Sequence, residues 1–341
     1  MSIELSDQPV FKLGIDAGSC RFEVRLNDVP ILRSDAALPF DVEFPVSEWI
    51  VRGPNRLAAL VSPPPVWDEG GEEQLERERF DPAESALRLT LWVKRNGAPR
   101  EERRAITTLN FVARDVAEPA TSAPAGPPPV GSTGPTAAAG PASDPTPGAG
   151  EGWQSSAPAG RYDSQRAFGR DDAQGDVMVS EVTFERNDEP PHEAFLFRDV
   201  GMRSPFPRWA WEDGLTIADD DSTHAALLAE YERVWSLLLA RDVAGIEQLQ
   251  QTKAAEYQAA YYLDAARLRD ALPLVDLMQS EDLRLQPLLR DLELRVFGEG
   301  RLARLVDEDG DSPIVFVGPG EIGYFVELTY ARTDDGWRLV R

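Results

Sequence analysis

The chain has 341 residues and a formal net charge of −24, because 59 Asp and Glu outnumber 35 Lys and Arg. Hydrophobic residues make up 42% of it, which is enough to build one or two cores. Such an acidic chain repels phosphate, which argues against nucleic acid as a partner. One cysteine, Cys20, excludes a disulfide framework and a multi-cysteine zinc site, and no apolar run reaches the roughly 20 residues of a membrane span.

Residues 1–117 show the period of strands. Residues 20–26, 87–93 and 106–112 show a period of two, in which the odd-numbered and even-numbered side chains would face opposite sides of a strand. Two turn-forming pairs, Asn27-Asp28 and Asn96-Gly97, follow the first two of these segments. The pattern predicts an antiparallel all-β sandwich, with Cys20 on its buried face.

Part of this region resembles a known family. The segment Val24-Arg-Leu-Asn-Asp-Val-Pro-Ile-Leu precedes Phe44–Ile50 and then Gly53-Pro-Asn-Arg-Leu. This order is similar to that of the galactose-binding-like jelly rolls, although Asp28 stands where glycine usually follows the asparagine. The resemblance implies a binding scaffold that suits many ligands. Carbohydrate binding by the sandwich is one alternative function, and it needs exposed aromatics such as Trp67 or Trp92.

Residues 118–176 are rich in proline, glycine and alanine and hold few large apolar side chains. Such a segment buries too little surface to offset the entropy lost when a chain becomes ordered. We predict a disordered linker with local polyproline II character, which separates two domains that move independently.

Residues 177–341 predict an α+β domain, with helices packed on a curved antiparallel sheet. Strand-like runs come first, at 177–184 and 195–198. The acidic residues 219–221 then cap a helix whose apolar face recurs through residues 227–238, and a second helix follows over 246–261. Shorter helices are expected at 264–280 and 283–291. After residue 291 the period changes to two, which predicts an antiparallel meander with turns at Gly298-Glu-Gly and Asp335-Gly336.

This order of elements resembles the nuclear-transport-factor-2-like, or cystatin-like, cone domains. The helix junction Arg241-Asp-Val-Ala-Gly-Ile-Glu-Gln-Leu carries part of the resemblance. The ending Tyr324-Phe-Val-Glu-Leu-Thr-Tyr, followed by Asp335-Gly-Trp-Arg-Leu-Val, carries the rest. Enzymes of this kind often place histidine and aspartate inside the cone, but no histidine lies in the predicted meander here. The resemblance therefore implies the fold without implying catalysis.

No pattern of catalytic or metal-binding residues stands out. The two histidines, His192 and His224, have no paired nucleophile or base in the sequence. The run Asp307-Glu-Asp-Gly-Asp lacks the spacing of a calcium loop and predicts a tight turn. We assign no catalytic residue, metal or cofactor; the sequence favours a non-enzymatic protein and leaves enzymatic activity open.

The distribution of charge indicates where a partner would bind. Residues 161–341 carry 20 basic and 36 acidic residues, a net charge of −16, whereas residues 1–118 carry −6 and residues 119–160 carry −2. Such a field keeps a protein soluble and steers basic proteins toward it. The N-terminal residues lack the pattern of a signal peptide, and we expect a cytoplasmic protein with no membrane or nucleic-acid partner.

These observations favour a non-enzymatic binding or accessory protein whose acidic C-terminal domain engages a basic protein, as in bacterial immunity or secretion. The candidate docking residues are Trp209, Trp211, Asp219, Asp220 and Asp221. An alternative is small-molecule binding or catalysis in a cone-shaped cavity. Its candidate lining residues are Tyr257, Tyr261, Tyr324 and Glu327, with Glu327 on the strand face opposite Tyr324.

Overall fold

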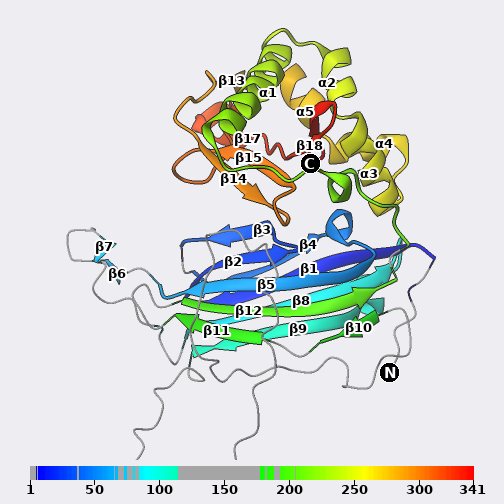
Figure 1. Cartoon of the computed structure of the whole chain (residues 1–341), viewed down its shortest axis with the longest axis vertical. Coiled ribbons are helices and arrows are strands. Elements are labelled where there is room, and N and C mark those ends of the chain that lie inside the picture. The colour runs from blue at the N-terminus through cyan, green and yellow to red at the C-terminus, as the bar shows by residue number, and fades with distance from the viewer. Residues whose placement is uncertain are drawn as a thin grey trace, which may run out of the picture.

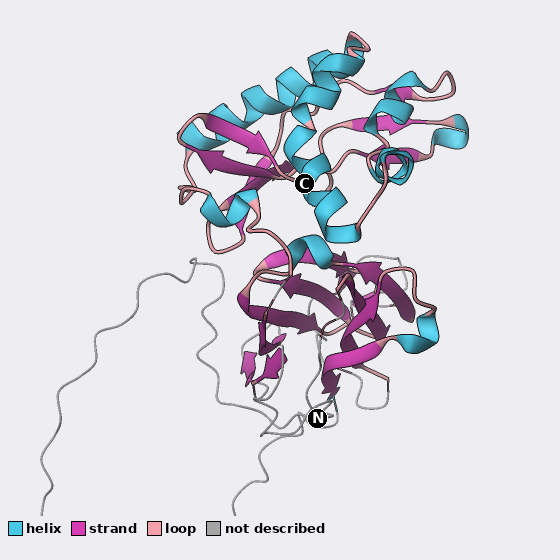
Figure 2. Ribbon diagram, turned by 90° about the vertical axis from the view of Figure 1, so that its right-hand side faces the viewer, coloured by secondary structure: helices cyan, strands magenta, loops and turns pink. Residues whose placement is uncertain are grey.

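The computed structural model has two parts, a β-sandwich and a mixed region of helices and short strands (Figure 1). It describes residues 5, 7–36, 38–64, 66–67, 73–74, 80, 84–113, 177–180, 183–187, 193–203 and 205–341. In the other view, the helices gather in the C-terminal part while the strands fill the sandwich (Figure 2). The expected all-β region and the expected region of helices with strands are both present. The predicted linker, residues 118–176, lies outside the described residues, and so does His192.

The sandwich consists of two antiparallel sheets. One has the strand order β4-β1-β8-β9, and the other has the order β10-β12-β5-β2-β3, with β11 also paired to β12. The first sheet contains β1 (Pro9–Gly18), β4 (Phe40–Pro45), β8 (Ala86–Arg95) and β9 (Arg104–Val112). The second contains β2 (Arg21–Leu26), β3 (Val29–Ser34), β5 (Gly53–Ser62), β10 (Val177–Val179), β11 (Thr183–Asn187) and β12 (Glu193–Met202). A small separate pair joins β6 (Val66–Trp67) to β7 (Glu73–Gln74).

The predicted alternation accounts for the core of the sandwich. Phe22, Val24 and Leu26 on β2 are buried, and they pack in one cluster with Leu13 and Ile15 on β1. Asn27 and Asp28 both adopt positive φ, at 54° and 63°, which gives the tight turn between β2 and β3. Burial raises the pKa of the Cys20 thiol to about 12, so this side chain is a small apolar core group.

The pairing of β12 corrects the predicted domain boundary. Residues 177–202 were expected in the α+β region, but β12 pairs with β5 from Ala194↔Val61 to Met202↔Gly53. The strands β10, β11 and β12 therefore belong to the sandwich. In the sequence, residues 118–176 lie between two strands of the sandwich, β9 and β10, rather than between two domains. The local period predicts a strand at 195–198, but it does not tell which partner strand, some 140 residues away, that strand will join.

Five helices and two small sheets make up the described residues from 221 onward. The helices are α1 (Asp221–Leu239), α2 (Val243–Leu249), α3 (Gln251–Tyr261), α4 (Ala265–Ala271) and α5 (Leu274–Gln279). One sheet has the order β13-β16-β17, with β13 (Arg284–Leu285), β16 (Val315–Val317) and β17 (Gly323–Phe325). The other has the order β14-β15-β18-β19, with β14 (Glu293–Phe297), β15 (Leu302–Val306), β18 (Tyr330–Thr333) and β19 (Gly336–Leu339).

Three expectations about this region need correction. The second predicted helix divides into α2 and α3 at Gln250, and residues 283–291 are not helical, because Arg284 and Leu285 pair with β16. The predicted single meander divides into two sheets, since β15 pairs with β18 while β16 and β17 join β13. Between β15 and β16 the chain turns at Asp307, whose carboxylate accepts hydrogen bonds from the backbone N–H groups of Asp309 and Asp311.

The core of the C-terminal part forms between α1 and the sheets. The predicted apolar face of α1 is buried at Leu227, Tyr231, Val234 and Leu238. The Tyr231 hydroxyl donates to the Leu328 carbonyl over 3.0 Å, which ties the helix to the segment before β18. None of the described helices is both long and apolar enough to cross a membrane.

Candidate functional site

The strand β17 lies at the edge of its sheet, and its apolar side chains are exposed. Within the described residues it pairs with β16 and has no second neighbour. Ile322 is 59% exposed, Tyr324 42% and Phe325 46%. Most large apolar side chains in folded proteins are buried, and three exposed ones on a free strand edge are typical of an interaction surface.

The hydrogen-bond register shows which backbone groups of β17 are free. Gly318 N donates to Ile322 O and Val326 N donates to Ile314 O, so these residue pairs are the hydrogen-bonded ones in the ladder. Bonded and non-bonded pairs alternate along two antiparallel strands. Gly323 and Phe325 therefore lie in non-bonded pairs, and their N–H and C=O groups point away from β16, toward the open edge.

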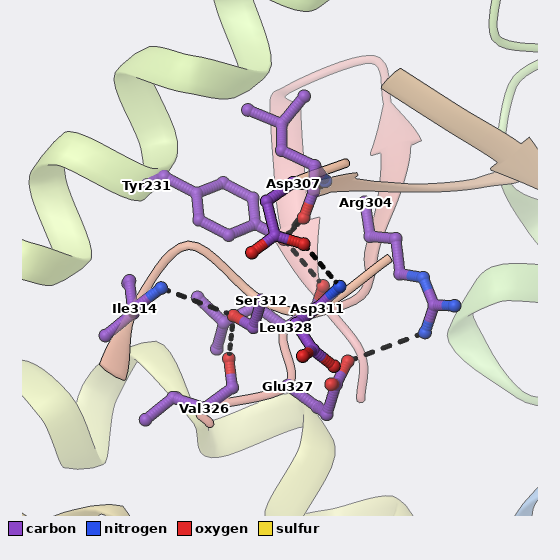
Figure 3. Close-up of polar contacts among 10 residues, drawn as sticks. Tyr231, Arg304, Asp307, Asp311, Ser312, Ile314, Val326, Glu327 and Leu328 are labelled. Carbon is purple, nitrogen blue, oxygen red and sulfur yellow. Dashed lines mark hydrogen bonds and ion pairs between the residues drawn. The ribbon is translucent and has the colours of Figure 1, made fainter. Parts of the chain in front are cut away.

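Acidic residues surround this edge. Glu321 precedes the strand and Glu327 follows it, and both side chains are exposed. In the nearby turn, Asp311 lies beside Glu327, whose carboxylate also makes a 3.5 Å ion pair with Arg304 (Figure 3). We call the exposed residues Glu321, Ile322, Tyr324, Phe325 and Glu327, together with the free backbone of β17, the β17 edge.

The two neighbouring carboxyl groups hold their protons more tightly than usual. Desolvation by surrounding protein raises the pKa of Glu327, and the charge of Asp311 raises it further, against the opposing effect of Arg304. Desolvation together with Asp307 and Asp309 raises the pKa of Asp311. A cationic side chain placed beside them would relieve this repulsion. The β17 edge thus offers apolar contacts, unpaired backbone groups and negative charge.

Two of the predicted cavity residues lie where the helices meet the sandwich. The Tyr261 hydroxyl donates to the Glu48 carboxylate and accepts from Ser47 N at 3.2 Å, and the Tyr257 and Tyr261 rings are 5.8 Å apart. Burial and the Glu48 charge raise the pKa of both tyrosines. Burial also raises the pKa of Glu48, against the effect of Arg341.

Lys253 lies in the same cluster. Its Nζ is 5.7 Å from the centre of the Tyr257 ring, and no described residue makes a hydrogen bond or ion pair with it. Desolvation and the nearby charge of Arg341 lower the pKa of Lys253 to about 8. The charge of Glu327 also acts on it. The lysine is therefore held in an environment that disfavours its charged form.

The cluster does not bring together all four predicted cavity residues. Tyr324 lies apart, beside Gly318, with its ring at the exposed edge. Glu327 lies beyond the end of β17, so the prediction that it shares a strand with Tyr324 does not hold. The predicted grouping thus separates Tyr257 and Tyr261, which join the two parts of the protein, from Tyr324 at the β17 edge, while Glu327 belongs to that edge and its charge also reaches Lys253 in the cluster.

The predicted docking residues do not form one exposed surface. Trp209 and Trp211 are 0% and 5% exposed, and the Trp209 indole donates to Ile50 O over 2.8 Å, so both pack inside the protein. Asp220 is the N-cap of α1 and accepts from Thr223 N at 2.8 Å, which lowers the pKa of its carboxyl group. Asp219 and Asp221 remain exposed next to it.

The described residues show no cluster that fits a metal ion. No group of three or more His, Cys, Asp or Glu side chains among them is arranged to hold one. His224 lies alone, with its Nε2 3.0 Å from Leu292 O.

Sequence reasoning missed Glu48, Lys253, Arg341 and Ile322 as candidate site residues, and it treated Phe325 as an ordinary strand residue. A signal for the edge was present, since the glycine-rich segment Gly318-Pro-Gly precedes a short aromatic strand that has Glu321 before it and Glu327 after it. A comparison of the chain with protein-family models, curated proteins and solved structures gives no match. The resemblances to cone domains and to galactose-binding-like jelly rolls therefore stay predictions.

Proposed function

We propose that this is a binding protein whose acidic C-terminal region takes up an extended basic segment of a partner protein along the β17 edge. The observation that carries the proposal is the combination of outward-facing backbone groups at Gly323 and Phe325 with exposed apolar side chains on the same strand. A partner segment added as a further strand would form main-chain hydrogen bonds with these two residues.

Charge supports a basic partner. Residues 204–341 hold 14 basic and 26 acidic residues, a net charge of −12. Glu321 and Glu327 stand at the two ends of the edge strand, where they would meet side chains at either end of a bound segment. Opposite charge speeds encounter and selects partners more than it adds affinity, because exposed ion pairs are screened by water and salt.

Apolar contacts would supply most of the affinity. Ile322, Tyr324 and Phe325 are the exposed aromatic and aliphatic groups that binding would cover, and side chains of these kinds often dominate interface energies. A partner segment with basic and apolar residues in alternation would place its apolar groups on one face of the added strand. The proposed recognition pattern is therefore an extended Lys/Arg–apolar repeat.

A designed peptide tests the proposal. The peptide Lys-Val-Lys-Val-Lys-Val-Lys should bind the full-length protein in calorimetry, and added salt should weaken the binding. The matched control carries N-methyl groups at alternate residues, which removes the donors needed for strand addition but keeps the charge. If both peptides bind equally, or if Glu-Val-Glu-Val-Glu-Val-Glu binds as well, the proposal is wrong.

A further inference from the structure

The chain holds three lysines, and one of them differs from the other two in its surroundings. They are Lys12, Lys94 and Lys253, against 32 arginines. All three are half-buried, so none is sealed from solvent. Lys12 Nζ donates to the Glu43 carboxylate at 2.9 Å, and Lys94 Nζ donates to Ala98 O at 2.6 Å. The amine of Lys253, in contrast, makes no hydrogen bond or ion pair with any residue that the structure describes.

Groups from three parts of the chain surround Lys253. Its Nζ is 5.7 Å from the centre of the Tyr257 ring, which lies one turn farther along α3. Arg341 at the end of the chain, Glu48 in the sandwich and Glu327 after β17 all act on the amine through their charges. Because Glu327 is exposed and Lys253 is only half-buried, a small molecule can reach the amine from solvent.

These surroundings favour the neutral amine. Desolvation and the charge of Arg341 lower the pKa of Lys253 to about 8, although Glu48 and Glu327 oppose the shift. At pH 7 roughly a tenth of such amines is neutral, against fewer than about one in a thousand for an ordinary lysine. The neutral form carries the free electron pair that attacks a carbonyl carbon. Lys253 therefore combines the nucleophilic form with freedom from a hydrogen-bond partner among the described residues.

We infer that Lys253 is a reactive amine that condenses with the carbonyl group of a small aldehyde. The nitrogen bonds to the carbonyl carbon, and one proton moves from nitrogen to oxygen to give a carbinolamine. The nitrogen then gives up its second proton and the hydroxyl group leaves as water, so the products are an imine and one water molecule. No oxidant or reductant takes part. The inference does not rest on the proposed function, because it concerns a covalent ligand at another residue, and its test contains no peptide.

Reductive trapping in the full-length protein tests the inference. Propanal, or glyoxylate in a parallel sample, is added at pH 7 with cyanoborohydride, which reduces an imine to a stable secondary amine. Peptide mass spectrometry then gives the rate of labelling at each lysine. Lys12 and Lys94 are matched controls, since they are also half-buried but have hydrogen-bond partners. We expect Lys253 to be labelled about tenfold faster or more, because more of it is neutral.

The two probes distinguish two sources of the aldehyde. Faster labelling of Lys253 by propanal would indicate an uncharged aldehyde, and faster labelling by glyoxylate would indicate one that carries a carboxylate. The inference is overturned if Lys253 reacts no faster than Lys12 and Lys94 with either probe.

A pH profile separates a reactive amine from one that is merely more accessible. Labelling of Lys253 should level off above about pH 8, whereas labelling of an ordinary lysine rises up to about pH 10. Glu327→Gln should move this plateau to lower pH, because the Glu327 carboxylate favours the charged amine. Lys253→Met should lose the label and still fold, since it removes a desolvated amine without a partner among the described residues. A profile for Lys253 that rises without a plateau to pH 10 would contradict the inference.

Discussion

The Arg341 guanidinium donates from Nη2 to the main-chain carbonyl of Glu48 over 2.6 Å, which joins residues 293 positions apart in the chain. The same guanidinium forms a buried ion pair with Glu256 on α3 and lies 4.8 Å from the centre of the Trp49 ring. Arg341 is only 4% exposed. One side chain thus connects the end of the last strand, the helix α3 and the sandwich.

Removal of this guanidinium should destabilise the protein strongly. In Arg341→Ala, the Glu256 carboxylate and the Glu48 carbonyl lose their buried partner, and a broken buried pair costs about 3–5 kcal/mol. Urea unfolding at neutral pH measures the loss. Arg295→Ala, which breaks only an exposed pair with Glu293, should cost less than about 1 kcal/mol. A similar small loss in both variants would contradict a structural role for Arg341.

Lys253 should lower the stability of the protein at neutral pH. Its ammonium group is desolvated and has no hydrogen-bond partner among the described residues, so Lys253→Met should raise the free energy of unfolding by about 1–3 kcal/mol at pH 7. The pKa is about 8 in the folded protein and near its ordinary value of about 10.4 in the unfolded chain.

The same shift predicts a pH dependence with a definite sign. Between these two pKa values the unfolded state binds more protons than the folded state, so stability should rise with pH above about 8 in the wild type. The advantage of Lys253→Met should therefore shrink between pH 8 and pH 10. Urea unfolding of both proteins across this range measures it, and a constant difference would show that the lysine titrates normally.

Two buried tyrosines on neighbouring elements should respond differently to the loss of a hydroxyl group. The Tyr231 hydroxyl bonds to Leu328 O at 3.0 Å and accepts from Leu305 N at 3.2 Å, so Tyr231→Phe should cost about 1–3 kcal/mol. The Tyr330 hydroxyl is buried and makes no hydrogen bond with any residue that the structure describes, so Tyr330→Phe should be neutral or stabilising. The rings are 5.7 Å apart, which makes them a matched pair. Equal losses in thermal unfolding would argue against this hydrogen-bond assignment.

Binding of the basic peptide should weaken when the solution is made acidic. Desolvation raises the pKa of Glu327 and Asp311, so these groups should begin to lose their charge at a higher pH than ordinary carboxyl groups do. Calorimetry from pH 7 down to pH 5 should show a falling affinity for Lys-Val-Lys-Val-Lys-Val-Lys. Glu327→Gln should bind more weakly at pH 7 and should depend less on pH. An affinity that is constant over this range would show that these two carboxyl groups do not contribute to peptide binding.

Local patterns predicted elements well where one face of an element is buried. The alternation of residues 20–26, the turn at Asn27-Asp28 and the apolar face of α1 all correspond to the structure. The motif Gly53-Pro-Asn-Arg-Leu has a structural role, because Asn55 Oδ1 accepts from Asn27 Nδ2 at 2.9 Å and from Val51 N at 2.8 Å. The two asparagines that carried the family resemblance thus bond to each other.

The sequence patterns did not predict which strands pair when they lie far apart in the chain. β12 could pair with any strand edge that has the same period, and its choice of β5 depends on the whole sandwich. Residues 283–291 have an apolar spacing that suits a helix, but tertiary pairing with β16 makes a short strand of Arg284 and Leu285. Glu48 and Arg341 are ordinary surface residue types, and only the folded chain brings them together.

Amide hydrogen exchange at β17 tests the central claim most directly. In the free protein, the amides of Gly323 and Phe325 point away from β16 and should exchange rapidly, whereas the amide of Tyr324, in a hydrogen-bonded pair, should exchange more slowly. Saturating Lys-Val-Lys-Val-Lys-Val-Lys should protect Gly323 and Phe325, and the N-methylated peptide should not. Unchanged exchange at these two amides, with the peptide bound elsewhere, would contradict strand addition at this edge.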